Sequence, residues 1–209
     1  MKKLLSKIIC FLCIVSATMC FVSCFDDDST PYPSLKTDLV VAETNAAGVV
    51  SKIKLDNGEM YDVTSKEVKF GVADTLFRCL ASYAMENKGI KIYGITNIFS
   101  SKPVPLATLL EDGTYTEETL PRDPVEIISM WKSGGYINMQ LGVLTTGNAS
   151  HAYAFCEEEK GKYSLLHRRP LNVAESYTSV VFLSMPIPDG VESLTFSVNT
   201  YEGTSMRTF

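Results

Sequence analysis

Short runs of β-forming residues separated by turn signals fill the chain from residue 37 onward, and this pattern restricts the fold more than any other feature. Apolar side chains alternate with polar or small ones at Ile137, Met139, Leu141 and Val143, as in a strand with one buried face. Downstream of the N-terminal segment, no long run has the 3.6-residue period of an amphipathic helix. The sequence therefore predicts an all-β fold.

A segment rich in proline and acidic residues, Glu111–Pro124, divides the expected strands into two groups and has no sustained apolar period. The first group has about five short strands, which suits a small barrel of the OB type. The second has about six strands at spacings of roughly ten residues, which favours a sandwich of two sheets. We predict an OB-like β-barrel at residues 37–108, a linker at 109–124 and a β-sandwich at 125–209.

The N-terminus has the layout of a secretory signal. Lysines without acidic residues precede an apolar run, Ile8–Val22, which is shorter than the ~20 residues that cross a bilayer. The run ends in Phe21–Cys24, and small residues directly before a cysteine resemble the lipobox of bacterial lipoproteins. We interpret residues 1–23 as a signal peptide and Cys24 as the residue that is lipidated.

Residues 24–36 continue from the predicted lipid site as an acidic, proline-containing segment, with three consecutive aspartates at Asp26–Asp28. Such a segment is typical of a solvated tether, and acidic residues after a lipidated cysteine also resemble the surface-export signals of some Gram-negative lipoproteins. We predict an outer-membrane lipoprotein, held through an acyl chain such as palmitate on Cys24 and located at the cell surface or on the periplasmic face.

Composition argues against several classes of function. The net charge of −5 disfavours a nucleic-acid partner held by phosphate contacts. The part of the chain after Cys24 contains no nucleophile elbow, no phosphate-binding glycine loop and no zinc-spaced cysteine pair. We therefore predict that the protein is not an enzyme and holds no cofactor or metal. Its two remaining thiols, Cys79 and Cys156, are expected to be buried side chains rather than a disulfide.

The two histidines of the chain, His151 and His167, fall on adjacent expected strands that flank a turn at Lys160. Pairing about this turn places His167 opposite Tyr153 and His151 opposite Arg169, so the histidines need not be direct partners. Metal or general-base chemistry would need a further partner that the sequence does not supply. We expect a structural or surface pair.

The string Trp131–Tyr136 is the most distinctive local sequence, because a glycine pair separates the single tryptophan from a tyrosine. Trp131 and Tyr136 are candidate binding residues, since aromatic side chains beside a turn can form a platform for a sugar or a peptide. The competing interpretation, that Trp131 lies in the core of the sandwich, carries more weight because large aromatic residues dominate core energetics.

Several strings together resemble NigD-like lipoproteins of gut and oral Gram-negative anaerobes. They are Ala73–Tyr83, Lys102–Pro105, Asp123–Val125 and Trp131–Asn138, in addition to the lipobox at Cys24. The resemblance implies an N-terminal OB-like domain followed by a C-terminal β-sandwich, and a role in immunity to a bacteriocin. It implies no catalytic or ligand-binding residues.

These observations lead to one expected function and one alternative. We expect a non-enzymatic interaction protein of the cell envelope, with the membrane bound through Cys24 and with a bacteriocin or an envelope protein as its partner. The alternative is a surface accessory lipoprotein that binds a glycan or a peptide at Trp131 and Tyr136.

Overall fold

The computed structural model describes residues 34–64, 67–146, 150–171 and 176–209. The predicted signal peptide (1–23), the predicted lipid site Cys24 and most of the tether (24–36) lie outside the described residues. Within the described ranges, none of the helices is long and apolar enough to cross a membrane. Residues 35–209 form one compact unit, in which three sheets are present.

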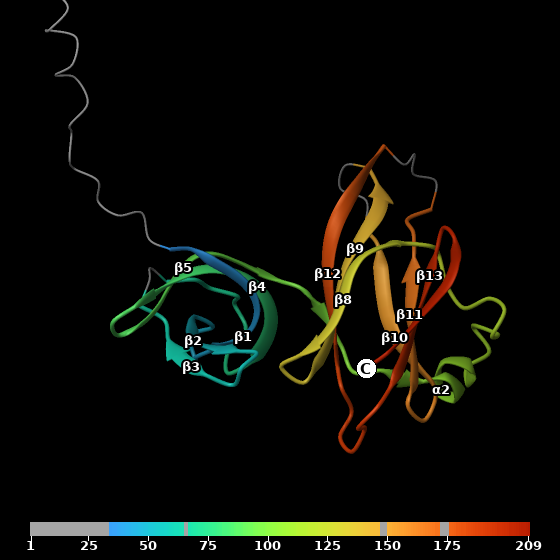
Figure 1. Cartoon of the computed structure of the whole chain (residues 1–209), viewed down its shortest axis with the longest axis horizontal. Helices are drawn as coiled ribbons and strands as arrows, with labels where there is room; N and C mark the ends of the chain where they lie inside the picture. The colour runs from blue at the N-terminus through green and yellow to red at the C-terminus, as the bar shows by residue number, and fades with distance from the viewer. Residues whose placement is uncertain (1–33, 65–66, 147–149, 172–175) are drawn as a thin grey trace, which may run out of the picture. The chain divides into compact units, whose positions relative to one another are not determined.

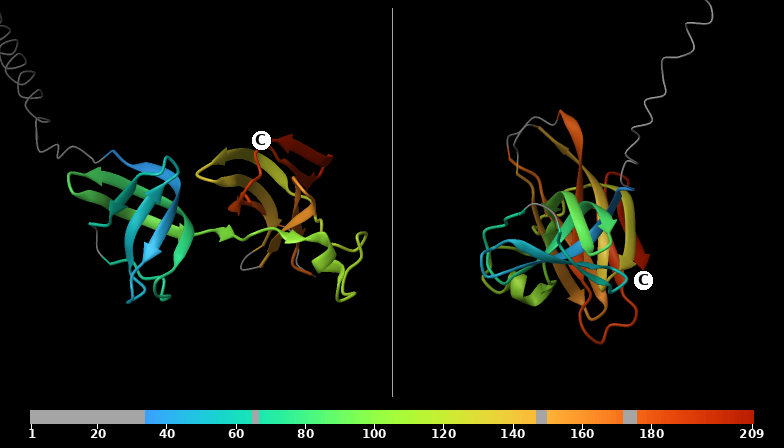
Figure 2. Two further views of the ribbon diagram at one scale, coloured as in Figure 1. Left: turned by 90° about the horizontal axis from the view of Figure 1, so that it is seen from below. Right: turned by 90° about the vertical axis from the view of Figure 1, so that its left-hand side faces the viewer.

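The first sheet has five strands in the order β3-β2-β1-β4-β5, paired antiparallel (Figure 1). These strands are β1 (Lys36–Thr44), β2 (Val50–Leu55), β3 (Met60–Asp62), β4 (Leu76–Glu86) and β5 (Gly89–Asn97). A parallel bridge between Val63 and Ile90 joins the end of β3 to β5, so the sheet curls until its two edges meet. Figure 2 shows these strands, blue to green, wrapped around a common interior. The predicted OB-like barrel is confirmed.

Alternation of side chains places the core inside this barrel. On β4, Cys79, Ala81 and Tyr83 are buried, as the sequence pattern predicts for one face of this strand. Met85, which alternation places on the same face, is 41% exposed because it lies near the end of the strand beside the turn into β5. Arg78 lies on the opposite face of the strand and is buried as well.

The two remaining sheets form the sandwich. One has the order β6-β12-β9-β8 and the other the order β14-β13-β11-β10-β7. Their strands are β6 (Phe99–Ser100), β7 (Val104–Pro105), β8 (Glu126–Ser133), β9 (Tyr136–Thr145), β10 (Ala152–Glu159), β11 (Lys162–Arg168), β12 (Tyr177–Pro186), β13 (Thr195–Thr200) and β14 (Gly203–Thr208). The all-β fold with a C-terminal β-sandwich is thus confirmed.

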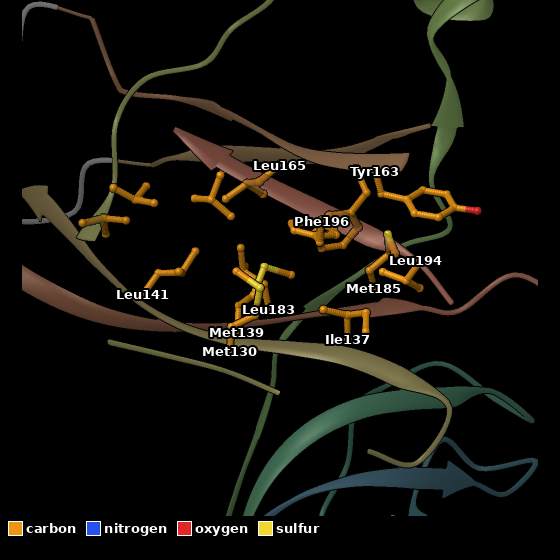
Figure 3. Packing of buried hydrophobic residues seen from close by; sticks show 14 residues of the cluster. Met130, Ile137, Met139, Leu141, Tyr163, Leu165, Leu183, Met185, Leu194 and Phe196 are labelled. Carbon is orange, nitrogen blue, oxygen red and sulfur yellow. The ribbon is translucent and has the colours of Figure 1, made fainter. Parts of the chain in front are cut away.

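The core of the sandwich lies between its two sheets (Figure 3). Alternate residues of β9 point inward, among them Ile137, Met139 and Leu141, and they meet Tyr163 of β11 and Phe196 of β13. All five side chains are at most 1% exposed. The period-two pattern of β9 therefore identified its buried face correctly.

The segment between the barrel and β8 belongs structurally to the sandwich. The two-residue strands β6 and β7 lie inside the range predicted for the barrel, yet each pairs in parallel with a strand of the sandwich, β12 and β10 respectively. A short helix, α2 (Leu106–Leu110), follows β7. Leu120 is buried against Cys156 and Leu166. The domain limits 37–108, 109–124 and 125–209 stay predictions.

Candidate functional site

Arg78, near the start of β4, is a buried arginine that forms a two-pronged ion pair. Its side chain points away from the barrel interior and is 1% exposed. Its Nη1 donates to Oδ1 of Asp56 at 2.6 Å, and its Nη2 donates to Oδ2 at 2.9 Å. Asp56 lies in the turn after β2. A buried guanidinium must be paired and hydrogen-bonded. The two hydrogen bonds to the Asp56 carboxylate meet both requirements.

Three side chains of the sandwich complete the hydrogen bonding around this pair. Asn138 of β9 accepts from Nη2 of Arg78 at 3.0 Å, and Ser184 of β12 donates to the same Asn138 oxygen at 2.7 Å. Ser133 donates to Oδ2 of Asp56 and accepts from the Asn138 amide at 2.9 Å. Asn138 and Ser184 are 0% exposed. These five residues, called the Arg78 network below, join the barrel to the sandwich through buried polar contacts.

The turn between β8 and β9 closes over this network. The guanidinium carbon of Arg78 lies 4.3 Å from the centre of the Tyr136 ring, a cation–π contact. Gly134 has φ of +59°, and a Cβ atom there would lie 2.3 Å from Oδ1 of Asp56. Glycine is therefore required at this position for both its backbone conformation and its close approach to Asp56. Three residues of the Trp131–Tyr136 string, namely Ser133, Gly134 and Tyr136, thus lie against Asp56 or Arg78.

The electrostatics of the network keep its acid ionised. Burial raises the pKa of Asp56, but the hydrogen bonds from Arg78 and Ser133 and the charge of Arg78 outweigh burial, so the pKa falls below the ordinary range. The neighbouring Cys79 thiol has its pKa raised to about 12 by burial, with Arg78 opposing this effect. Cys79 and Cys156 are both buried and free, as predicted.

A first groove beside the network, groove A, has a volume of about 550 Å³. It is lined by residues of β1 to β4 and by the β8–β9 turn, among them Val41, Lys54, Met60, Leu76 and Tyr136. Its lining is a mixture of apolar and charged side chains.

A second groove, groove B, has a volume of about 510 Å³ and includes Lys36, Leu39, Leu80, Trp131 and Phe182 in its lining. The two grooves share three lining residues at the β2–β3 turn: Leu55, Asp56 and Asn57. Asp56 of the Arg78 network is thus part of the wall of both.

The two candidate binding residues do not form one platform. Trp131 lines groove B, whereas Tyr136 lines groove A and stacks on Arg78. The interpretation of Trp131 as a core residue is wrong: it is half-buried and outside the core cluster of the sandwich. The register pairs Trp131 with Asn138, whose side chain faces the Arg78 network, so both lie on the outer face of their sheet.

The two histidines are in direct contact. The register pairs His167 with Tyr153, as predicted, and Nδ1 of His151 lies 2.9 Å from Nε2 of His167. Nδ1 of His167 lies 3.0 Å from the carbonyl oxygen of Asp123, which can only accept. His167 therefore carries its proton on Nδ1, and His151 donates to its Nε2.

His167 is 2% exposed, and burial lowers its pKa, although the hydrogen bond to the Asp123 carbonyl opposes this effect and His151 adds to it. Among the described residues, no group of three or more His, Cys, Asp or Glu side chains is arranged to hold a metal ion.

The Arg78 network is the part of the site that the sequence did not reveal. Neither Asp56 nor Arg78 is among the candidate residues that the sequence provides. The available signal was their position: Arg78, Ser133 and Asn138 all lie inside the strings that carry the family resemblance.

Comparison with known proteins agrees with this architecture. Residues 106–169 match the family model of the NigD-like C-terminal beta sandwich domain. No curated protein matches the chain.

Solved structures similar to the chain include a NigD-like immunity protein from Bacteroides caccae, with 24% identity, TM-score 0.62, and 85% of this chain and 93% of that chain covered. A protein described as toxin related from Parabacteroides distasonis has 18% identity, TM-score 0.66, and coverage of 84% and 92%. A protein described as a lipoprotein from Bacteroides fragilis has 10% identity, TM-score 0.55, and coverage of 85% and 96%. The resemblance indicated by the sequence motifs is confirmed, through the match of residues 106–169 to the NigD-like C-terminal beta sandwich domain and through the similar fold of the NigD-like immunity protein.

Proposed function

We propose that the chain is a non-enzymatic binding protein of the cell envelope, held at the outer membrane through a lipid on Cys24, with a bacteriocin or an envelope protein as its partner. The observation that carries this proposal is the pair of grooves walled by Asp56 of the Arg78 network. A surface held in shape by buried, fully bonded groups loses little conformational entropy when a partner binds. The similar structures named as an immunity protein and described as a lipoprotein support this assignment.

The chemistry of the network supports binding over catalysis. Asp56 is ionised and bonded to Arg78 and Ser133, so it is a poor proton acceptor at neutral pH. The Cys79 thiol, with a pKa of about 12, is protonated and a weak nucleophile. The charged groups of the Arg78 network are therefore engaged in structural hydrogen bonds and are not available as catalytic groups.

Three experiments test this proposal. The lipidated full chain, immobilised and presented to detergent-solubilised envelopes, is expected to retain a specific protein, whereas a Cys24→Ala variant is expected to leave the membrane fraction on cell fractionation. Deletion of the gene is expected to sensitise cells to the cognate bacteriocin, and restoration of the full chain is expected to reverse this. Unchanged sensitivity would remove the immunity role, and failure to retain any protein would remove the binding function.

A second candidate function, glycan binding at the cell surface, is favoured by the position of Trp131. This half-buried ring lies in groove B with Phe182, and the polar residues Lys36, Asp38 and Asn57 line the same groove. An aromatic surface with a few polar groups around it is a typical small-ligand site. A Trp131→Ala variant is expected to lose retention on immobilised envelope polysaccharide while keeping its thermal stability; equal retention would exclude this candidate.

A further inference from the structure

Groove A contains a row of cross-strand neighbours with an unusual composition. The register pairs Val41 of β1 with Arg78 on one side and with Lys54 of β2 on the other, and it pairs Lys54 with Met60 of β3. Directly opposed residues share a face and have neighbouring side chains. Lys54 is therefore an exposed cation whose two cross-strand neighbours are apolar.

The adjacent row provides an internal comparison. Lys52 pairs with Glu43 of β1 and with Asp62 of β3, so it has a carboxylate on each side. Lys52 and Lys54 are both exposed, lie on the same strand and face, and line the same groove. None of the ion pairs found among the described residues includes either lysine. The difference between them is that no carboxylate lies directly opposite Lys54 on either neighbouring strand.

Exposed apolar side chains line groove A. Met60 is 54% exposed and Leu76 is 67% exposed, and with Val41 they give groove A an apolar lining. Burial of such surface by a partner is favourable by roughly 25 cal/mol per Å² of apolar area. Tyr136, whose ring stacks on Arg78, adds a wall that is already fixed in place.

The balance of charge in the groove limits the kind of occupant. Glu43 and the ionised Asp56 also line groove A, so a polyanion such as nucleic acid would meet two carboxylates there. A single carboxylate between apolar groups fits better, because it can pair with Lys54 while its flanking groups cover Met60 on one side and Val41 on the other. In an extended protein segment, residues two positions apart point to the same side, so an acidic residue and its apolar neighbours two positions away can all face the sheet.

We propose that groove A is the docking site for an extended segment of the partner protein in which one acidic residue is flanked, two positions away on each side, by apolar residues. The carboxylate pairs with Lys54, and the apolar side chains pack on Met60 and Val41. This inference rests on the proposed function, because it names the chemistry of the partner and the surface that binds it.

The direct test uses synthetic peptides as probes. Fluorescein-labelled Leu-Ser-Glu-Ser-Leu and its charge-reversed counterpart Leu-Ser-Lys-Ser-Leu are titrated into the purified full chain, with binding followed by fluorescence anisotropy. The glutamate peptide is expected to bind more tightly than the lysine peptide. Lys54→Ala is expected to weaken its binding by roughly tenfold, and Lys52→Ala by less than about twofold. Equal binding of the two peptides, or equal loss in the two variants, would overturn the inference.

A second arm separates failure of this inference from failure of the proposed function. The unaltered chain, Lys52→Glu, Lys54→Glu and Met60→Ser are each presented to solubilised envelopes. Loss of the retained protein from Lys54→Glu and Met60→Ser, but not from Lys52→Glu, supports groove A as the site. Retention by all variants overturns groove A and leaves the binding function intact. No retention by the unaltered chain overturns the function itself. Urea unfolding of each variant establishes that all are folded.

Discussion

Arg78 and Asp56 meet end to end, with Nη1 2.6 Å from Oδ1 and Nη2 2.9 Å from Oδ2. The arginine comes from near the start of β4 and the aspartate from the turn after β2, so the pair lies across the outer face of the barrel sheet. Asn138 and Ser184 approach the same guanidinium from two strands of the sandwich. One charged group thus organises contacts among four separate segments of the chain.

Arg78→Ala is expected to destabilise the protein strongly. Removal of the guanidinium leaves Asp56 and Asn138 without their partner in a buried setting, and loss of one member of a buried pair costs about 3–5 kcal/mol. Urea unfolding measures this loss. Lys69→Ala, which removes an ion pair with Glu67 whose side chains are 63% and 70% exposed, is the control, with an expected change below about 0.5 kcal/mol. Similar losses in both variants would contradict the role assigned to the network.

Gly134→Ala and Gly135→Ala form a matched pair. Both glycines have positive φ, +59° and +82°, so both variants introduce backbone strain. A Cβ at Gly134 would collide with Asp56, whereas one at Gly135 would meet nothing within 4 Å. Gly134→Ala is therefore expected to be less stable than Gly135→Ala by roughly 1–3 kcal/mol, the range for a disturbed buried polar group. Equal unfolding midpoints would show that Asp56 is free to move.

The buried histidine gives stability a dependence on pH. Burial depresses the pKa of His167 in the folded state, whereas the unfolded chain takes up this proton near pH ~6.5. The unfolded state then binds more protons, so the stability present above about pH 6.5 is lost as the pH falls through the folded pKa. Urea unfolding between about pH 7.5 and 5 measures this slope, which lies above the range where carboxylates titrate. His167→Gln is expected to flatten it, and an unchanged slope would assign the effect elsewhere.

Trp131→Ala is expected to destabilise the protein much less than substitution of a core aromatic residue. Trp131 is half-buried on the outer face of its sheet, whereas Phe196 is 0% exposed between the two sheets. Phe196→Ala is expected to cost about 3–5 kcal/mol and Trp131→Ala clearly less. Since Trp131 is the single tryptophan, acrylamide quenching of its fluorescence reports its exposure directly. Losses of equal size, together with a fully protected tryptophan, would place it in the core.

The sequence predicted those parts of the fold that depend on local period. Apolar residues alternate along strand β9, and Ile137, Met139 and Leu141 face the core of the sandwich. The hairpin of β10 and β11 has the predicted pairing of His167 with Tyr153. Both features follow from residues that are close together in the sequence, the first from the two-residue period of a strand and the second from the turn that joins the two strands.

The buried polar site could not be predicted in the same way. An arginine at an outward-facing position of a strand is usually solvated, and nothing adjacent to Arg78 in sequence indicates that Asn138 and Ser184 cover it. The same reason explains the error on Trp131: alternation shows that a residue faces outward, but not what covers that face. The strands β6 and β7 were missed because two residues are too short to have a period.

These two short strands have a consequence for how the chain acquires its structure. Phe99 of β6 pairs with Leu183, and Val104 of β7 pairs with Cys156. The segment that follows the barrel therefore pairs with strands that come much later in the sequence. Contacts of such large sequence separation form slowly, because the intervening loop must be closed first. The five barrel strands lie close together in the sequence, so they can pair while the rest of the chain is still being synthesised. Because Leu183 and Cys156 come later in the chain, β6 and β7 can cover the edges of the two sandwich sheets only after β12 and β10 have been synthesised.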